Sequence, residues 1–221
     1  MGAFIIAVDG PAAAGKGTLA RRLATELHLA HLDTGALYRA TARDVLAAGL
    51  DPADAAGAAE LAGKLDPASL ADPGLRGEEI GRVASIVSVH PAVRTALLDY
   101  QRNFAYHPPN EAKGAVLDGR DIGTVICPEA TVKLFVTASL EARAGRRLRE
   151  LETSGAPADA AAVLADLQAR DERDSKRSAA PLKVATDAVL LDTSGLDADE
   201  AFGAAMSIVR ARTRSFGSSQ A

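Results

Sequence analysis

Residues 10–18 read Gly-Pro-Ala-Ala-Ala-Gly-Lys-Gly-Thr and stand between the apolar run at 4–8 and a helical pattern that begins at Lys16. A buried strand, a glycine-rich turn and a helix together bind phosphate, because backbone N–H groups and the positive end of the helix dipole converge on the turn. We expect Lys16 to reach the β- and γ-phosphates of a nucleotide and the Thr18 hydroxyl to help hold Mg²⁺. The expected ATP-binding residues of this loop are Gly10, Pro11, Ala12, Ala13, Ala14, Gly15, Lys16, Gly17 and Thr18.

Length and composition indicate a soluble α/β enzyme. The chain has 221 residues, of which 48% are hydrophobic, enough for one domain with an inserted subdomain. The net charge of -4 and the 4% aromatic content argue against long nucleic acid as a partner, so any basic site must be local. Cys127 is the only cysteine, which excludes an intramolecular disulfide. No apolar run approaches about 18 residues, so we expect no membrane partner and a cytoplasmic chain.

Apolar runs alternate with helical patterns along the chain. We expect buried strands at 4–8, 30–32, 115–117, 131–136 and 188–191, and helices at 16–29, 34–48, 140–151, 160–177 and 197–210. This alternation predicts a parallel five-stranded sheet with ligands at the carboxyl ends of its strands. Residues 50–72 are alanine-rich and punctuated by prolines, which predicts a short helix and loops outside the sheet, and 78–104 has helical periodicity broken at His90-Pro91. We expect the two stretches together to form a helical lid over a substrate.

Three charged segments follow expected strands or helices at the same edge of the sheet. The first segment is residues 33–39, in which Thr34 stands at a helix start and Arg39 follows one turn later. Together they could bind a second anion, although an ordinary N-cap with a surface arginine is the alternative. The second segment is residues 118–121, in which Asp118 could hold a water molecule bound to Mg²⁺ and Arg120 could face a phosphate. A hydrophilic turn is the alternative.

The third segment is the Arg-rich helix at 170–177. Arg170, Arg173, Asp174 and Arg177 recur at helical spacing, so three guanidinium groups can close over a phosphoryl group from one helix face. A solvated, salt-bridged helix is the alternative reading. Arg146, in the cluster 143–149, could grip ATP in the same way, or could simply be solvated.

The segments offer several arginines but no obvious carboxylate base. An alcohol acceptor benefits from such a base, whereas the phosphate of a nucleotide is already anionic at neutral pH. The pattern therefore favours phosphoryl transfer to a phosphate, with cations that screen the two reacting groups from each other.

Together these motifs resemble those of bacterial cytidylate kinases, which belong to the nucleoside monophosphate (NMP) kinase family of P-loop kinases. The matching pieces are the loop 10–18, Leu-Asp-Thr-Gly-Ala-Leu-Tyr-Arg at 32–39, Ala-Ser at 84–85, Pro-Ala-Val-Arg at 91–94, Asp-Gly-Arg-Asp-Ile-Gly-Thr at 118–124 and the Arg-rich run at 170–177. The resemblance implies phosphorylation of CMP and dCMP by ATP with Mg²⁺, a P-loop three-layer α/β sandwich, and a monomer.

The resemblance also implies a domain plan and roles for single residues. One domain would span 1–212, with a core at 1–48, 114–140 and 178–212, a helical NMP-binding insertion at about 49–113 and a short Arg-rich lid at about 141–177, followed by a flexible tail at 213–221. The catalytic residues would be Lys16, Arg120, Arg170 and Arg177. The CMP-binding residues would be Thr34, Arg39, Ser85, Arg94, Arg120, Asp121, Arg170, Asp174 and Arg177, and the Mg²⁺ ligands Thr18 and Asp118, the latter through water.

The chain departs from the family pattern in its phosphate loop, where Ala12 and Ala13 stand in place of serine and glycine. Two other functions remain open at this point. One is another small-molecule P-loop kinase that acts on UMP, AMP or a shikimate-type alcohol. The other is a regulatory module that binds ATP without catalysis.

Overall fold

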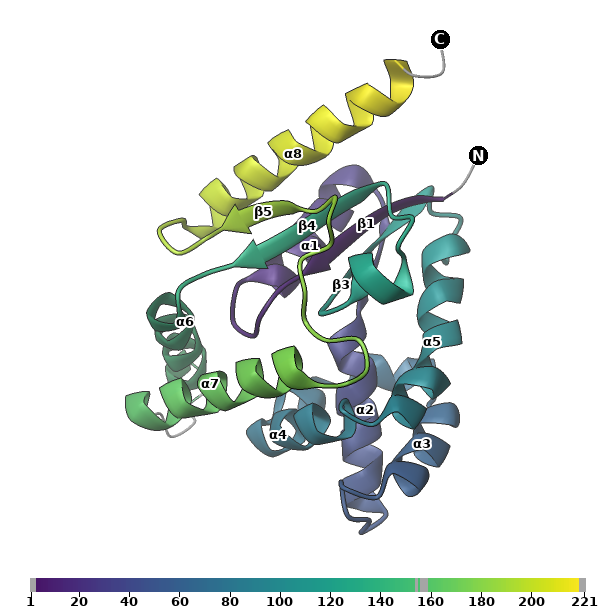
Figure 1. The fold of residues 1–221 in the computed structure, drawn as a ribbon, viewed down its shortest axis with the longest axis vertical. Helices are drawn as coiled ribbons and strands as arrows, with labels where there is room; N and C mark the ends of the chain where they lie inside the picture. The colour runs from purple at the N-terminus through teal and green to yellow at the C-terminus, as the bar shows by residue number, and fades with distance from the viewer. Residues whose placement is uncertain (1–2, 154, 156–158, 219–221) are drawn as a thin grey trace.

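The computed structural model describes residues 3–153, 155 and 159–218, and it contains one parallel sheet (Figure 1). The strands are β1 (Phe4–Asp9), β2 (Ala30–Asp33), β3 (Gly114–Gly119), β4 (Val132–Thr137) and β5 (Val189–Asp192), in the order β2-β3-β1-β4-β5. Every neighbouring pair is parallel. The predicted α/β fold with a five-stranded parallel sheet is therefore confirmed.

Alternate residues of the central strand face two helical layers. Ile6 and Val8 of β1 pack with α1 (Lys16–Leu27) and α8 (Ala198–Ser218). Ile5 and Ala7 face the other way, toward α5 (Pro91–Tyr106) and the short turn η3 (Ile122–Ile126). Because β1 is buried on both faces, its sequence is a continuous apolar run.

The helices between β2 and β3 form a cluster of their own beside the sheet. They are α2 (Thr34–Ala47), α3 (Ala55–Gly63), α4 (Glu78–Val87) and α5, with the short turns η1 (Pro67–Ala71) and η2 (Pro73–Arg76). Their apolar faces share one core that includes Leu37, Val87 and Leu97. The helix break expected at His90-Pro91 is present, since α4 ends at Val87 and α5 begins at Pro91.

Helices α6 (Leu140–Thr153) and α7 (Ala160–Lys176) pack on each other near the phosphate loop. Leu151, Val163 and Leu167 form a small apolar cluster with Ala12 of that loop. In Figure 1 the arrows of β4 and β5 point to the side of the molecule where α6 lies. Helix α6 therefore lies toward the carboxyl edge of the sheet.

The C-terminal helix differs from the prediction. Helix α8 continues to Ser218, well past the expected end at 210, so the part of the expected tail at 213–218 is helical, and 219–221 lie outside the described residues. Cys127 is buried in the core, as expected of a packing residue. Among the described residues, no helix combines the length and the apolar character needed to cross a bilayer.

Candidate active site

The phosphate loop has a backbone that depends on its glycines. Gly10 has φ +147°, and a Cβ there would come within 1.9 Å of the Val136 carbonyl oxygen, so no other residue fits. Gly15 caps the start of α1 with φ +85°. Ala13, which replaces the glycine of the family pattern, also adopts a left-handed conformation with φ +57°. Ala13 therefore carries backbone strain that a glycine at this position would not have.

Lys16 lies buried inside this loop. Its Nζ donates to the Pro11 carbonyl oxygen at 2.7 Å, so the ammonium group is held across the mouth of the loop. Burial, with the nearby Arg120 guanidinium as the next cause, lowers the pKa of Lys16 to about 7. An anionic ligand would restore the charged form, because an opposite charge favours it. The loop is thus poised to gain stability from a bound phosphate.

A cleft of about 1510 Å³ runs from the phosphate loop across the carboxyl edge of the sheet; we call it the nucleotide cleft. Twelve lysine and arginine side chains line it, against eight carboxylates, although the chain as a whole is acidic. This local excess of positive charge suits polyphosphate. The expected site residues that line the cleft are Ala12, Ala13, Gly15, Lys16, Gly17, Thr18, Thr34, Arg39, Ser85, Arg94, Asp118, Arg120, Asp121, Arg146, Arg170, Asp174 and Arg177. Gly10, Pro11 and Ala14 are buried and do not line it.

Asp121 lies between two guanidinium groups in the cleft. Arg94, from α5, donates to Asp121 Oδ2 through a very short contact, and Arg177 donates to Asp121 Oδ1 at 3.4 Å. Arg94 also lies 5.5 Å from the centre of the Tyr38 ring. All three charged side chains are largely buried. Asp121 therefore joins residues from both sides of the cleft.

Asp174 forms a second junction. Its Oδ2 accepts from Arg120 Nε at 2.7 Å, and its Oδ1 lies 3.9 Å from Arg177. Burial works to raise the pKa of Asp174, but the guanidinium groups of Arg120, Arg177 and Arg170 together outweigh it and hold the pKa below its usual value. Arg170 lies 3.8 Å from Asp166 on the same helix. The expectation of one helical face was wrong for Arg177, because α7 ends at Lys176 and Arg177 has an extended backbone with ψ 140°.

The start of α2 lies at the same edge of the sheet. Asp33 caps the helix by accepting from Ala36 N at 3.2 Å, and its other oxygen accepts from Arg39 at 2.6 Å. The Thr34 hydroxyl donates to the Asp118 carbonyl oxygen at 2.8 Å. The segment therefore is an N-cap, and in addition it directs Thr34 and Arg39 into the cleft.

Two arginines of α6 have different surroundings. Arg146 donates to Thr193 Oγ1 at 3.0 Å and to the Thr193 carbonyl oxygen, beside the phosphate loop. Arg143 is buried, donates to the Ala12 carbonyl oxygen at 3.3 Å and pairs with Asp171 of α7 at 2.7 Å. Arg143 therefore fastens α6 and α7 to the loop, whereas Arg146 lines the cleft.

Comparison with known proteins agrees with this geometry. The family model for cytidylate kinase matches residues 6–211. The chain belongs to the cytidylate kinase family. It is 61% identical over 205 residues to the cytidylate kinase of Paramagnetospirillum magneticum, covering 93% of this chain and 97% of that protein. It is 58% identical over 206 residues to the one from Rhodospirillum rubrum, covering 93% and 97%. The resemblance stated from the motifs is thus confirmed.

A solved structure shares the fold at low sequence identity. An uncharacterized protein from Eubacterium ventriosum is 15% identical, covers 92% of this chain and 96% of its own, and superposes with a TM-score of 0.52. At this identity the likeness concerns the fold alone.

Three side chains of this cytidylate kinase family member have contacts that the sequence did not predict: Asp9 and His31 were not named, and Arg173, expected to close over a phosphoryl group, does not line the nucleotide cleft. Asp9 is buried and accepts from the backbone N–H groups of Ile122 and Gly123 at 2.8 and 2.7 Å, and burial raises its pKa to about 6. His31 Nε2 lies 2.9 Å from Asp118 Oδ2. Arg173 donates to Ser85 Oγ at 3.0 Å and so joins α7 to α4.

Only one of the three carried a sequence signal. Asp9 directly precedes Gly10 at the end of a buried strand, where an ionisable group is unusual. His31 and Arg173 acquire their partners only through tertiary contacts, since Asp118 and Ser85 are 87 and 88 residues away in the chain.

Proposed function

We propose that this chain transfers the γ-phosphoryl group of ATP to the 5′-phosphate of CMP or dCMP, giving ADP and CDP or dCDP. The observation that carries the proposal is the arrangement of Lys16 in a phosphate loop and of Arg94, Arg120 and Arg177 along one cleft. Two anionic ligands that react with each other need such a cleft, because cations must offset their mutual repulsion. The residues of one chain suffice, so we expect a monomer.

The proposed division of the fold follows the two groups of helices. Residues 49–113 would form the NMP-binding insertion and 141–177 the lid, while 1–48, 114–140 and 178–212 would form the core. The separate apolar clusters of the two helical groups support this division. The lid would move as a unit because Arg143 ties α6 to Asp171 of α7.

ATP would bind with its β- and γ-phosphates in the loop 10–18. Lys16 would leave the Pro11 carbonyl oxygen to contact phosphate, and the free N–H groups at the start of α1 would bind the same oxygens. Arg146 lies at the rim of the loop and would contact ATP from the lid. The loop supplies positioning and charge, which are the main requirements of phosphoryl transfer.

The acceptor phosphate would sit among Thr34, Arg39, Arg120, Arg170 and Arg177. Asp33, Asp121 and Asp174 pair with these arginines, so the carboxylates hold the guanidinium groups near the positions that a phosphate requires. The acceptor oxygen is already ionised, and no general base is needed. Asp174 and Arg170 would also contact the sugar.

The base would be read by Ser85, Arg94 and Asp121. Cytosine presents an amino donor beside ring acceptors, so a carboxylate or hydroxyl suits the former and a guanidinium suits the latter. Asp121 and Arg94 already pair with each other at the cleft wall. Uracil reverses part of the donor pattern and should be a poorer substrate.

Mg²⁺ would be held by the Thr18 hydroxyl and, through water, by Asp118. Both side chains line the cleft and offer oxygen, which Mg²⁺ prefers, while phosphates and water complete its coordination. His31 engages Asp118 Oδ2, and the other oxygen lies 3.8 Å from where a Cβ on Gly17 would stand, so Asp118 Oδ1 faces the loop. The bound ion would offset the charge on the transferred phosphoryl group.

A coupled assay of ADP release tests the proposal. CMP and dCMP should be the best acceptors among CMP, dCMP, UMP, AMP and shikimate. A preference for AMP or shikimate would instead favour another small-molecule P-loop kinase. ATP binding with no acceptor activity and no CMP binding would favour a regulatory module.

A further inference from the structure

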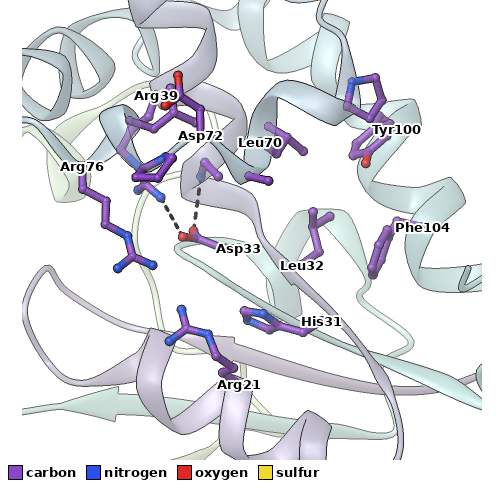
Figure 2. A pocket seen from close by; sticks show the side chains of 15 residues that line it. Arg21, His31, Leu32, Asp33, Arg39, Leu70, Asp72, Arg76, Tyr100 and Phe104 are labelled. Atoms are coloured by element: carbon purple, nitrogen blue, oxygen red, sulfur yellow. Dashed lines mark hydrogen bonds and ion pairs between the residues drawn. The ribbon is translucent and has the colours of Figure 1, made fainter.

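A second cavity, of about 530 Å³, opens beside the nucleotide cleft; we call it the side pocket (Figure 2). Its walls come from α1, β2 and α2 on one side and from η1, η2 and α5 on the other. Four residues, Arg21, Asp33, Arg39 and Arg76, line both cavities. Of the other residues that line the side pocket, only His31 enters the proposed function, through its contact with Asp118.

One end of the side pocket is apolar and partly aromatic. Leu32, Leu70, Tyr100 and Phe104 line it, and Figure 2 shows these four side chains on the same side of the cavity. Leu70, Tyr100 and Phe104 are each partly exposed. A flat ring could therefore bury apolar area between the leucines and the two aromatic rings.

The other end carries free positive charge. In Figure 2 the guanidinium groups of Arg21 and Arg76 both lie on the side of the pocket away from Tyr100. Neither guanidinium has a hydrogen bond or ion pair with any residue that the structure describes, and both residues are exposed. The Nε of Arg39 is buried there without a partner.

The carboxylates of the side pocket already have partners. Asp33 pairs with Arg39 at 2.6 Å, and Asp72 lies 3.5 Å from Arg43, which is outside the pocket. Burial works to raise the pKa of Asp33, but the Arg39 guanidinium, with His31 and the Ala36 N–H group, outweighs it and keeps the pKa below its usual value. The uncompensated charges are therefore those of Arg21 and Arg76.

We propose that the side pocket binds a small aromatic anion, a molecule that joins a flat ring to a phosphate or carboxylate group. The ring packs among Leu32, Leu70, Tyr100 and Phe104, and the anion lies between Arg21 and Arg76. The cavity volume lies within the range of small-molecule sites, which is roughly 300–1,000 Å³.

Occupancy of the side pocket weakens CMP binding, a consequence that rests on the proposed function. An anion beside Arg39 competes for the charge that the CMP phosphate would use, and the two anions repel each other. The coupling is reciprocal, so CMP weakens binding of the aromatic anion by the same factor. Because the two ligands occupy different cavities, this effect reaches a limit at high CMP.

Calorimetric titration of phenyl phosphate into the full chain tests the proposal. We expect a dissociation constant on the order of 1 mM, with inorganic phosphate and benzyl alcohol at least about ten-fold weaker. As the CMP concentration increases, the dissociation constant for phenyl phosphate should rise to a plateau. A dissociation constant that rises in proportion to the CMP concentration without limit would mean that phenyl phosphate binds in the nucleotide cleft, and this would overturn the proposal. The absence of phenyl phosphate binding would also overturn it.

Two tryptophan variants locate the binding. Ala71 of η1 lines the side pocket, so Ala71→Trp should fill it and abolish phenyl phosphate binding, while ADP release with CMP continues. Ala68→Trp, on the same turn at an exposed position that lines neither cavity, should bind phenyl phosphate normally. Equal binding by both variants would overturn the proposal. Phenyl phosphate binding is measured without turnover, so this result does not depend on whether CMP is the substrate.

Discussion

Arg120 Nε donates to Asp174 Oδ2 at 2.7 Å, although the two residues are 54 positions apart. The contact joins the turn after β3 to helix α7. The carboxylate thereby holds a guanidinium at the position where a transferred phosphoryl group is expected. Removal of either partner should therefore affect catalysis more than folding.

For the Arg120 and Asp174 pair, we predict that Arg120→Gln lowers kcat on the order of 10²-fold, since a donor to the transition state is lost. Asp174→Asn keeps the size of the side chain but not its charge, and should lower kcat/KM for CMP more than for ATP. Glu172→Gln, an exposed change on the same helix, is the control and should leave both constants unchanged. Similar losses in all three variants would contradict the positioning role.

Variants of Asp121 and Lys16 should have different effects on the kinetics with CMP and with ATP. Asp121→Asn removes the charge between Arg94 and Arg177, and should raise KM for CMP far more than KM for ATP. Lys16→Met should chiefly abolish turnover, since the lysine would contact the transferred group. Steady-state kinetics with each substrate varied in turn measures both effects. Equal increases of the two KM values in Asp121→Asn would argue against base reading.

The left-handed backbone of Ala13 predicts an unusual stability effect. Ala13→Gly relieves strain of about 1–2 kcal/mol, but glycine makes the unfolded chain freer by about 0.5–1 kcal/mol, so the free energy of unfolding should rise by up to about 1.5 kcal/mol. Ala12→Gly is the matched control, because Ala12 is buried and does not have a positive φ, and it should destabilise the chain. Urea unfolding measures both. A loss of stability in Ala13→Gly would show that the strain is absent.

Asp9 makes stability depend on pH. Its pKa is raised to about 6 from 3.8, so the folded state binds the proton more tightly than the unfolded state. Between about pH 4 and 6 the folded chain carries more protons on this group, and stability falls as the pH rises, by up to about 3 kcal/mol. The unfolding free energy of the wild type minus that of Asp9→Asn should therefore fall by that amount from pH 4 to pH 7. A constant or growing difference would exclude the raised pKa.

The sequence was sufficient for the sheet and the phosphate loop. Continuous apolar runs identified the buried strands, because strands covered on both faces need no polar alternation. The loop was recognisable because Gly10 and Gly15 adopt backbones that other residues rarely take. Asp118, Arg120 and Asp121 could be placed in the cleft, since a parallel sheet collects strand ends at one edge.

Pairwise contacts across the cleft could not be predicted from the sequence. Helical spacing placed Arg177 on the face of Arg170, but the helix ends one residue earlier and Arg177 turns toward Asp121. The cluster 143–149 looked uniform in the sequence, yet Arg143 is buried against the loop while Arg147 pairs with Glu150 at the surface. Both outcomes depend on tertiary packing, which spacing alone does not contain.

The central claim is that one cleft holds ATP and CMP together. Calorimetric titration of CMP into the chain saturated with a non-hydrolysable ATP analogue and Mg²⁺ tests it most directly. The account predicts one CMP bound per chain, with affinity at least equal to that of the analogue-free chain and lost in Arg94→Gln. Mutual exclusion of CMP and the ATP analogue would contradict it.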